Sequence, residues 1–398
     1  MSKKCVKPQL RFAGFEEDWE WRKLEEVCDS FEYGLNAPAK KFDGENKYIR
    51  ITDIDDSTRV FLNTDLSSPD CDLSKAENYR LQNGDIVFAR TGASVGKAFI
   101  YKASDGLVYY AGFLIRAKIS KNTYPDFVFY NTFTKQYEKF IRITSQRSGQ
   151  PGVNAQEYAT FEFSLPSYEE QNKIGNYFKN LDKLITLHQQ KYNKLVNIKQ
   201  FMLEKMFPKN GSNVPEIRFK GFSDAWEQCK VSEMFKVTRG YVLAATITEE
   251  NKSDEMPYPV YSSQTKANGL MGYYKDYLYE DAITWTTDGA NAGTVNYRAG
   301  KFYCTNVCGV LLSDNVKANQ MIAEALNKVA KGYVSYVGNP KLMNNVMADI
   351  KINVPISTAE QEKIGKLFSF IDHLITLHQR KVEKLQNMKK ACLEKMFV

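Results

Sequence analysis

Residues 171–207 read QNKIGNYFKNLDKLITLHQQKYNKLVNIKQFMLEKMF, and residues 361–397 repeat this stretch as QEKIGKLFSFIDHLITLHQRKVEKLQNMKKACLEKMF. The two copies are identical at 22 of 37 positions with a constant offset of 190. Chance does not produce such a match, so the chain is built from two copies of one structural plan.

A second, shorter motif is repeated upstream of each copy, and we call it the frame motif. Residues 8–15 read PQLRFAGF and are followed by Trp19, whereas residues 215–222 read PEIRFKGF and are followed by Trp226. The offset of this motif is 207 rather than 190, so the first intervening segment is 17 residues longer than the second. The order is therefore frame motif, variable unit and helix, twice over.

The repeated 37-residue stretch has the pattern of a long amphipathic helix. Its apolar residues recur at alternating spacings of mostly four and three, which is the heptad pattern of a helix that packs against another helix. We expect this packing to involve Ile174, Phe178, Leu181, Ile185, Leu195, Ile364, Phe368, Ile371, Ile375 and Leu385. At 1.5 Å per residue each helix would be about 55 Å long, which is typical of a spacer.

The variable units between these segments have the alternating pattern of short strands bounded by Gly, Asn and Asp turns. The expected strands are residues 85–90, 98–101, 113–119 and 282–286. The expected helices on these sheets are residues 127–133 and 321–326. Each variable unit is therefore predicted to be mainly sheet.

The composition is that of a folded protein, with 43% hydrophobic and 25% charged residues. This excludes a mostly disordered chain. No apolar run approaches the roughly 18 residues that span a bilayer, and the N-terminus does not read as a secretory signal, so we expect a cytoplasmic protein that does not enter a membrane. The seven cysteines are scattered along the chain, which favours reduced thiols, and their spacing does not indicate a metal site.

The positive charge is concentrated in the two predicted helices. Residues 171–207 carry seven Lys against two acidic residues, and residues 361–397 carry eight Lys or Arg against four. Such helices are often Lys-rich only for solubility. If the helices pack together, however, their like charges repel, so the apolar seam must overcome the repulsion or an anionic partner must offset it. DNA phosphate is a candidate for that partner.

Two loops between predicted strands share the pattern Gly-Ala-x-x-Gly. Residues 90–97 read RTGASVGK, and residues 287–294 read TDGANAGT. Glycines allow a close approach to a ligand, and the other side chains can donate to or accept from DNA. The candidates for DNA contact in these loops are Arg90, Thr91, Ser94, Lys97, Thr287, Asp288 and Asn291. The alternative is a pair of ordinary hairpins with exposed polar tips.

The first of these loops is not a phosphate-binding P-loop. Its glycine spacing is one residue short, and Ala98 stands where a P-loop has Ser or Thr. A strand rather than a helix is also expected to follow. The loop therefore lacks both the helix N-terminus and the magnesium ligand of that motif.

Two further polar loops, residues 145–154 and 261–269, contain side chains that can pair with bases, although the same residue types are common in turns. The candidates for DNA contact outside the glycine loops are Arg147, Gln150, Asn154, Gln264, Lys266 and Lys341. The loops of the two halves differ in their donors and acceptors. We expect this difference if the two domains share one structural plan but recognise different DNA sequences.

The repeat architecture and residues 165–175 (LPSYEEQNKIG), which lead into the long helix, resemble the specificity subunit of type I restriction-modification systems. Residues 85–97 (DIVFARTGASVGK) are similar to a signature of one class of recognition domain in that family. The resemblance covers essentially the whole chain. It implies a first target-recognition domain at 1–167, a helical spacer at 168–208, a second recognition domain at 209–356 and a second spacer at 357–398.

The resemblance implies an α+β fold in which two pseudo-symmetric mixed domains are separated by two long antiparallel, coiled-coil-like helices. It also implies a non-catalytic subunit without a cofactor or metal of its own. Its partners would be double-stranded DNA, two modification subunits that use S-adenosylmethionine to methylate adenine, and restriction subunits that use ATP and Mg. The second glycine loop departs from the signature because it has no counterpart of Arg90.

Two other functions remain alternatives. A DNA methyltransferase should contain an Asn/Asp-Pro-Pro-Tyr/Phe motif and a glycine-rich cofactor loop, but the nearest approach is Asn339-Pro340-Lys341. A coiled-coil adaptor that binds only proteins would not need two different sheet domains. A protein whose halves have different reading surfaces is instead expected to recognise an asymmetric, split DNA target with an unread spacer.

Overall fold

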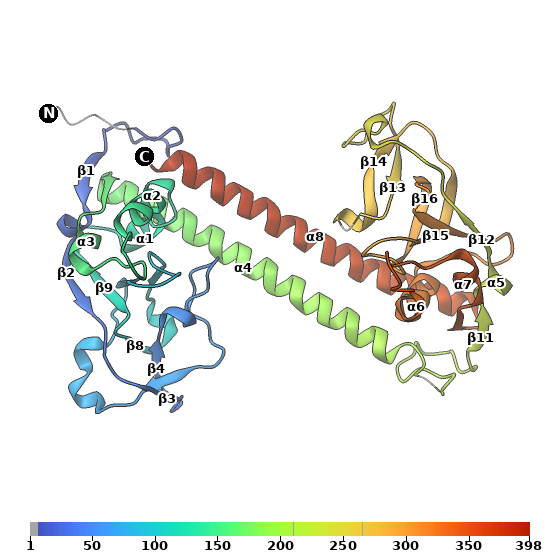
Figure 1. Ribbon diagram of the computed structural model, residues 1–398, viewed down its shortest axis with the longest axis horizontal. Helices are drawn as coiled ribbons and strands as arrows, with labels where there is room; N and C mark the ends of the chain where they lie inside the picture. The colour runs from blue at the N-terminus through green and yellow to red at the C-terminus, as the bar shows by residue number, and fades with distance from the viewer. Residues whose placement is uncertain (1–6, 210, 265) are drawn as a thin grey trace. The chain divides into compact units, whose positions relative to one another are not determined.

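The computed structural model describes residues 7–209, 211–264 and 266–398 (Figure 1). The chain forms two compact units. Unit 1 comprises Met1–Gln189 and Arg380–Val398, and unit 2 comprises Gln190–Gln379. Unit 1 therefore contains the first variable unit and unit 2 contains the second, each together with part of both long helices.

The two repeated stretches form the long helices that their pattern predicts. Helix α4 spans Tyr168–Lys205, and helix α8 spans Thr358–Met396. Acidic residues lie in the first turn of each helix and a lysine lies in the last, which complements the helix dipole. Helix α4 stops before Pro208, which has no amide hydrogen to continue the helical bonding.

Within each unit the two helices run antiparallel. In unit 1, Phe178 near the start of α4 packs on Phe397 at the end of the chain, with ring centroids 5.6 Å apart. In unit 2, Phe207 just after α4 packs on Phe368 near the start of α8, with centroids 5.7 Å apart. The seam residues Ile174, Phe178, Leu181, Ile185, Ile364, Phe368 and Ile371 are buried, and Leu195, Ile375 and Leu385 are half-buried.

The variable part of unit 1 is built on a four-stranded antiparallel sheet in the order β2-β9-β6-β7. These strands are β2 (Cys28–Tyr33), β6 (Ile86–Ala89), β7 (Ala98–Ile100) and β9 (Leu114–Ile119). The helices are α1 (Pro125–Asn131), α2 (Lys135–Thr144) and α3 (Ala155–Ala159). The paired strands outside the sheet are β1 (Glu20–Lys23) with β10 (Glu162–Leu165), β3 (Ala39–Lys41) with β5 (Ser67–Pro69), and β4 (Asn46–Ile49) with β8 (Leu107–Tyr110).

The variable part of unit 2 is built on a six-stranded sheet in the order β12-β17-β15-β16-β13-β14. These strands are β12 (Lys236–Arg239), β13 (Tyr258–Tyr261), β14 (Leu270–Tyr274), β15 (Tyr279–Thr286), β16 (Val295–Cys304) and β17 (Cys308–Leu312). The helices are α5 (Val231–Met234), α6 (Gln320–Ala330) and α7 (Asn344–Asp349). Strands β11 (Glu227–Lys230) and β18 (Lys351–Val354) form a separate antiparallel pair.

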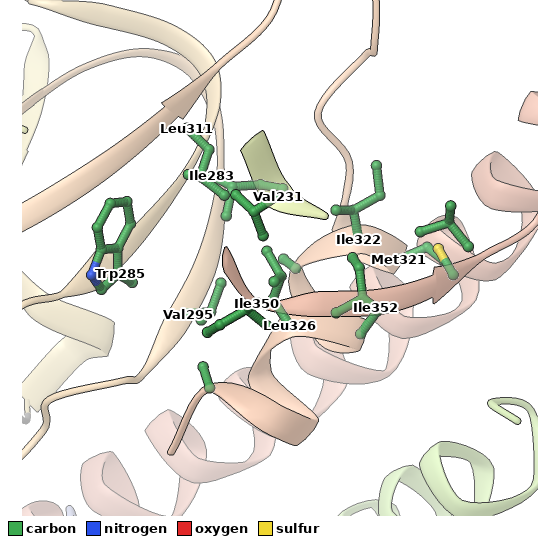
Figure 2. Packing of buried hydrophobic residues seen from close by; sticks show 14 of the residues in the cluster. Val231, Ile283, Trp285, Val295, Leu311, Met321, Ile322, Leu326, Ile350 and Ile352 are labelled. Carbon is green, nitrogen blue, oxygen red and sulfur yellow. The ribbon is translucent and has the colours of Figure 1, made fainter. Parts of the chain in front are cut away.

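One face of each sheet packs against helices. In unit 2, Ile283, Trp285 and Val295 of the sheet share a buried cluster with Met321 and Leu326 of α6 (Figure 2). Side chains alternate between the two faces of a strand, so the residues next to these three along the strands point to the opposite face of the sheet.

The helices expected at 127–133 and 321–326 and the expected strands are confirmed, and so is the α+β fold class.

The two sheets share one register around the glycine loops. In unit 1, Val87 pairs with Phe99, and in unit 2, Thr284 pairs with Asn296. Each residue of the first pair is related to its counterpart in the second pair by an offset of 197, which is the same offset that relates Gly92 to Gly289. Strands β6 and β7 therefore correspond residue by residue to β15 and the start of β16.

The frame motif anchors the start of a long helix in each unit. The guanidinium of Arg11 donates two hydrogen bonds to the Glu170 carboxylate, at 2.7 and 2.8 Å. Arg218 makes the same contact with Glu360, at 2.6 and 2.7 Å. Both carboxylates are almost completely buried, with 1% of the Glu170 side chain and 0% of the Glu360 side chain exposed. The repeated Arg and Glu are therefore conserved between the two halves as a bidentate ion pair, which we call the frame clamp.

No helix within the described residues is both long enough and apolar enough to cross a membrane.

Candidate nucleic-acid interface

The first glycine loop, residues 90–97, is a tight connection between β6 and β7. Gly92 and Gly96 have φ values of +77° and +85°, which favour glycine. The Gly96 amide donates to the Ala89 carbonyl at 3.0 Å, and the Val95 amide donates to the Gly92 carbonyl at 3.1 Å. A Cβ at Gly96 would lie 2.8 Å from the Ile141 side chain, so this glycine is also needed for packing.

The polar loop at residues 145–154 lies directly against this glycine loop. The Gly92 amide donates to the Pro151 carbonyl at 3.0 Å, and the Val153 amide donates to the Arg90 carbonyl at 2.9 Å. The hydroxyl of Thr91 also reaches the Pro151 carbonyl, at 3.4 Å. Two loops that the sequence analysis proposed separately therefore form one surface in unit 1.

Arg90 is held over two aromatic rings. Its guanidinium carbon lies 5.2 Å from the ring centroid of Tyr33 and 5.7 Å from that of Phe113. Both rings are well exposed, at 45% and 59%. Cation–π contacts of this kind restrict a flexible arginine while its donors remain available. The periodicity of the sequence did not identify Tyr33 or Phe113, because each belongs to a strand or turn remote from Arg90 in the chain.

Lys97 does not lie on the surface that its motif suggested. Only 6% of the residue is exposed, and its ammonium group donates to the Ile54 carbonyl at 3.0 Å and pairs with the Asp56 carboxylate. The side chain therefore ties residues 54–56 to the sheet. The expectation that Lys97 donates to DNA is corrected to this structural role, because the side chain is buried and its ammonium group is bonded to two oxygens of the protein.

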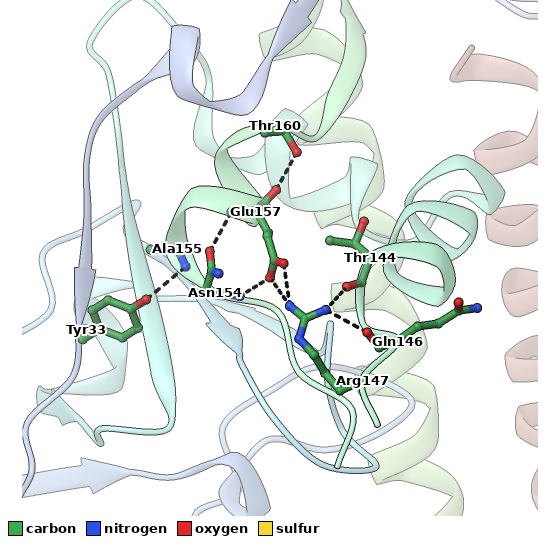
Figure 3. Close-up of polar contacts among 8 residues, drawn as sticks. All are labelled: Tyr33, Thr144, Gln146, Arg147, Asn154, Ala155, Glu157 and Thr160. Atoms are coloured by element: carbon green, nitrogen blue, oxygen red, sulfur yellow. Dashed lines mark hydrogen bonds and ion pairs between the residues drawn. The ribbon is translucent and has the colours of Figure 1, made fainter. Parts of the chain in front are cut away.

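Arg147 and Asn154 stabilise the polar loop from within (Figure 3). Arg147 donates to both oxygens of Glu157, at 2.5 and 2.6 Å, and to the Thr144 carbonyl at 2.8 Å. Asn154 caps helix α3 by accepting from the Glu157 amide at 2.9 Å. Gln150 is exposed and Ser94 is half-buried, so both side chains are accessible on this surface together with Arg90.

The second glycine loop, residues 287–294, has the same backbone geometry. Gly289 and Gly293 have φ values of +88° and +80°. The Gly289 amide donates to the Pro340 carbonyl at 2.9 Å, which is the contact that Gly92 makes with Pro151 in unit 1. Residues 339–341 are therefore the counterpart of residues 150–152, although only the proline is shared between them.

The side chains of the second loop make different contacts. Thr287 donates to Asp288 at 2.7 Å, and Asp288 forms an ion pair with Lys341 at 3.7 Å. Asn291 donates to the Ser263 carbonyl at 3.0 Å, which joins this loop to the polar loop at 261–269. In that polar loop the Gln264 amide group bonds to the Leu270 carbonyl. The side chain of Lys266 lies outside the part of the chain that the structure describes.

The hairpin before Lys341 adds two exposed apolar side chains that sequence analysis did not identify. Tyr336 and Val337 are among its most exposed residues, and Ser335 pairs with Lys341 at its base. An exposed aromatic at a loop tip has no periodic pattern, so no sequence signal marked it. Unit 2 therefore presents a carboxylate–lysine pair and a loop aromatic where unit 1 presents an arginine over two rings.

Comparisons with known proteins agree with the duplicated architecture. Residues 16–197 and 223–387 match the family described as "Type I restriction modification DNA specificity domain". The chain is 39% identical over 141 residues to a Mycoplasma pneumoniae protein described as the N-terminus of a putative type I specificity subunit, a match that covers 35% of this chain and 73% of that protein. It is 24% identical over 403 residues to a putative type I restriction enzyme specificity subunit of Methanocaldococcus jannaschii, which covers 95% of this chain and 92% of that one.

The fold has a solved counterpart. A crystal structure of a type I restriction-modification S subunit from M. genitalium superposes with a TM-score of 0.75, at 14% sequence identity. The match covers 99% of each chain.

Proposed function

Because the chain belongs to the type I restriction-modification DNA specificity family, we propose that it recognises the DNA target of a type I restriction-modification complex. The observation that carries this proposal is the pair of glycine loops. They have the same backbone bonds, one to Pro151 and one to Pro340, but they present different side chains. Two sites of one geometry and unlike chemistry are suited to reading two unlike sequences.

The target in this proposal is bipartite and asymmetric. Each unit reads one short half of the target, and the spacer between the halves is not read. A correctly read base pair contributes roughly 1 to 3 kcal/mol of discrimination, so two half-sites on one polypeptide combine into useful specificity. Phosphate contacts position the protein on the duplex but carry no sequence information.

The chain is proposed to act without chemistry of its own, as a cytoplasmic subunit. Two modification subunits, which bind S-adenosylmethionine, methylate adenine at the positions that this chain selects. Restriction subunits, which use ATP and Mg, complete the complex. Among the described residues no group of three or more His, Cys, Asp or Glu is placed to hold a metal ion, and the proposal needs none in this chain.

Mapping of methylated adenines tests this function. DNA would be treated with this chain together with its modification subunit, and the modified positions would be read by sequencing. We expect methylation at a split, asymmetric sequence that requires this chain. Methylation without sequence preference, or no retention of DNA by the assembled complex, would instead favour an adaptor that binds only proteins. Methylation by the isolated chain would favour the enzyme alternative.

A further inference from the structure

Unit 2 contains a polar cavity beside the second glycine loop. Its volume is about 90 Å³. It lies between the polar loop at 261–269, the glycine loop at 287–294 and strands β15 and β16. The side chains that matter for its chemistry are Ser262, Thr284, Asn291, Thr294, Asn296 and Arg298.

Arg298 is the charged group of this cavity, and only 9% of it is exposed. Its Nε donates to the Thr284 hydroxyl at 3.1 Å, and one Nη donates to the Asn268 carbonyl at 2.7 Å. The guanidinium carbon lies 3.7 Å from the ring centroid of Tyr261. None of the ion pairs between described residues involves Arg298. A buried cation is costly unless an opposite charge accompanies it.

The same part of the sheet in unit 1 belongs to an apolar core. Residues at the offset of 197 from Thr284, Thr286, Asn296 and Arg298 are Val87, Ala89, Phe99 and Tyr101. All four unit 1 residues belong to one buried hydrophobic cluster. Unit 2 has therefore replaced apolar side chains with polar ones at four matching positions and left a cavity among them. Stability alone does not explain this exchange, because apolar packing is the less costly solution.

We propose that this cavity binds a phosphate group, with Arg298 as its anchor. A guanidinium presents its donors as a planar fork that matches the oxygens of phosphate. The hydroxyl and amide groups of Ser262, Thr294 and Asn296 supply neutral hydrogen-bond donors around it. The cavity has room for a few water molecules or for one tetrahedral oxyanion in their place.

The phosphate can come from bound DNA or from solution, and only the first source rests on the proposed function. Asn291 belongs both to the cavity wall and to the glycine loop. A backbone phosphate held by Arg298 would therefore fix the position of that loop on the duplex. Such a contact positions the reader without reading a base.

The first experiment measures inorganic phosphate binding to the full chain by calorimetry, with chloride at matched ionic strength as the reference. We expect saturable binding that Arg298→Gln abolishes. Lys351→Gln serves as a control, because it removes an exposed positive charge from the same unit. Thermal unfolding of each variant checks that it remains folded.

A second variant tests the cavity without changing its charge. Asn296→Phe introduces the side chain that unit 1 has at the matching position, so it should fill the cavity while Arg298 remains. We expect phosphate binding to be lost here too, at an unfolding temperature close to that of the original chain. This variant keeps the test decisive if Arg298→Gln does not fold.

The second experiment measures how the DNA affinity of the chain with its modification subunits depends on salt. One phosphate contact contributes about 0.9 to the slope of log K against log salt concentration, so Arg298→Gln should reduce the slope by about one for every DNA sequence. Loss of phosphate binding with an unchanged slope would assign the cavity to free phosphate. If the original complex binds no DNA, the proposed function fails while the phosphate experiment still tests the cavity. Unchanged phosphate binding and an unchanged slope in both variants would overturn the proposal.

Discussion

Lys389 Nζ lies 2.6 Å from Asp182 Oδ1 in unit 1. At the repeat offset of 190 the equivalent residues are Lys199 and Asp372, and these form the same ion pair at 2.7 Å in unit 2. An apolar seam and an anionic partner are two ways to offset the positive charge of the helices. The ion pairs are a third way. Each repeat has one aspartate, at the same position, and this aspartate forms an ion pair with a lysine of the other helix.

The Lys389–Asp182 pair is expected to couple the two helices within unit 1. Lys389→Met and Asp182→Asn should show a coupling free energy of about 1 to 2 kcal/mol in a double-mutant cycle, because both groups are partly buried. Denaturant unfolding of the single and double variants measures it. Additive effects of the two changes would show that the pair contributes nothing.

The frame clamp is expected to stabilise each unit separately. Glu170→Gln removes the charge that partners Arg11 and should destabilise unit 1 by about 3 kcal/mol, as removal of one partner of a buried ion pair generally does. Glu360→Gln is the matched variant for unit 2. Hydrogen exchange resolves the two units. Unchanged protection of residues 168–185 in the Glu170→Gln variant would contradict this role.

Arg90→Ala is expected to weaken the reading of one half-site and to leave the other intact. Loss of one base contact costs about 1 to 3 kcal/mol, or roughly 5- to 150-fold in discrimination. The companion variant Lys97→Ala should act differently, because it removes a buried anchor and so lowers the unfolding temperature of unit 1. Methylation at altered half-sites measures the first effect. Equal loss of discrimination at both halves would count against separate readers.

The two glycines of the second loop should differ in their tolerance of a side chain. Both have positive φ, so an alanine costs about 1 to 2 kcal/mol at either position. At Gly293 the added Cβ would also lie 2.8 Å from the Val334 side chain, whereas at Gly289 it would meet open space. We therefore expect Gly293→Ala to be more destabilising than Gly289→Ala by about 1 to 3 kcal/mol in thermal unfolding. Equal effects would contradict the close packing at Gly293.

A chain that ends after Phe207 is expected to assemble as a symmetric pair. In the full chain Phe178 packs on Phe397, and Phe207 is the residue that corresponds to Phe397 at the repeat offset. Phe207 of a second copy can therefore cover Phe178 of the first. Light scattering after size-exclusion chromatography measures the mass. A well-folded monomer with full asymmetric specificity would contradict this expectation.

Much of the fold could be predicted because its main signals are local or repeated. The heptad spacing identified both long helices, and the shared Gly-Ala-x-x-Gly pattern identified two corresponding loops between strands. The burial of Lys97 could not be predicted in this way. Its partners Ile54 and Asp56 lie about 40 residues earlier in the chain, and no pattern links them to a loop motif.

The candidate interface was predicted less completely than the fold for the same reason. The rings of Tyr33 and Phe113 reach Arg90 only when separate strands pair, so spacing along the chain carries no trace of the contact. The equivalence of residues 150–152 and 339–341 depends on backbone bonds to the glycine loops. Because only one residue type is shared, sequence comparison did not detect it.

The frame clamp has a consequence for how such proteins can change. Arg11 and Glu170 lie in repeated segments on either side of the first variable unit, as Arg218 and Glu360 do for the second. A genetic crossover within these repeated segments would deliver a new reading domain together with both ends of its anchoring ion pair. New DNA specificities could then arise by recombination, without a series of compensating substitutions in the scaffold.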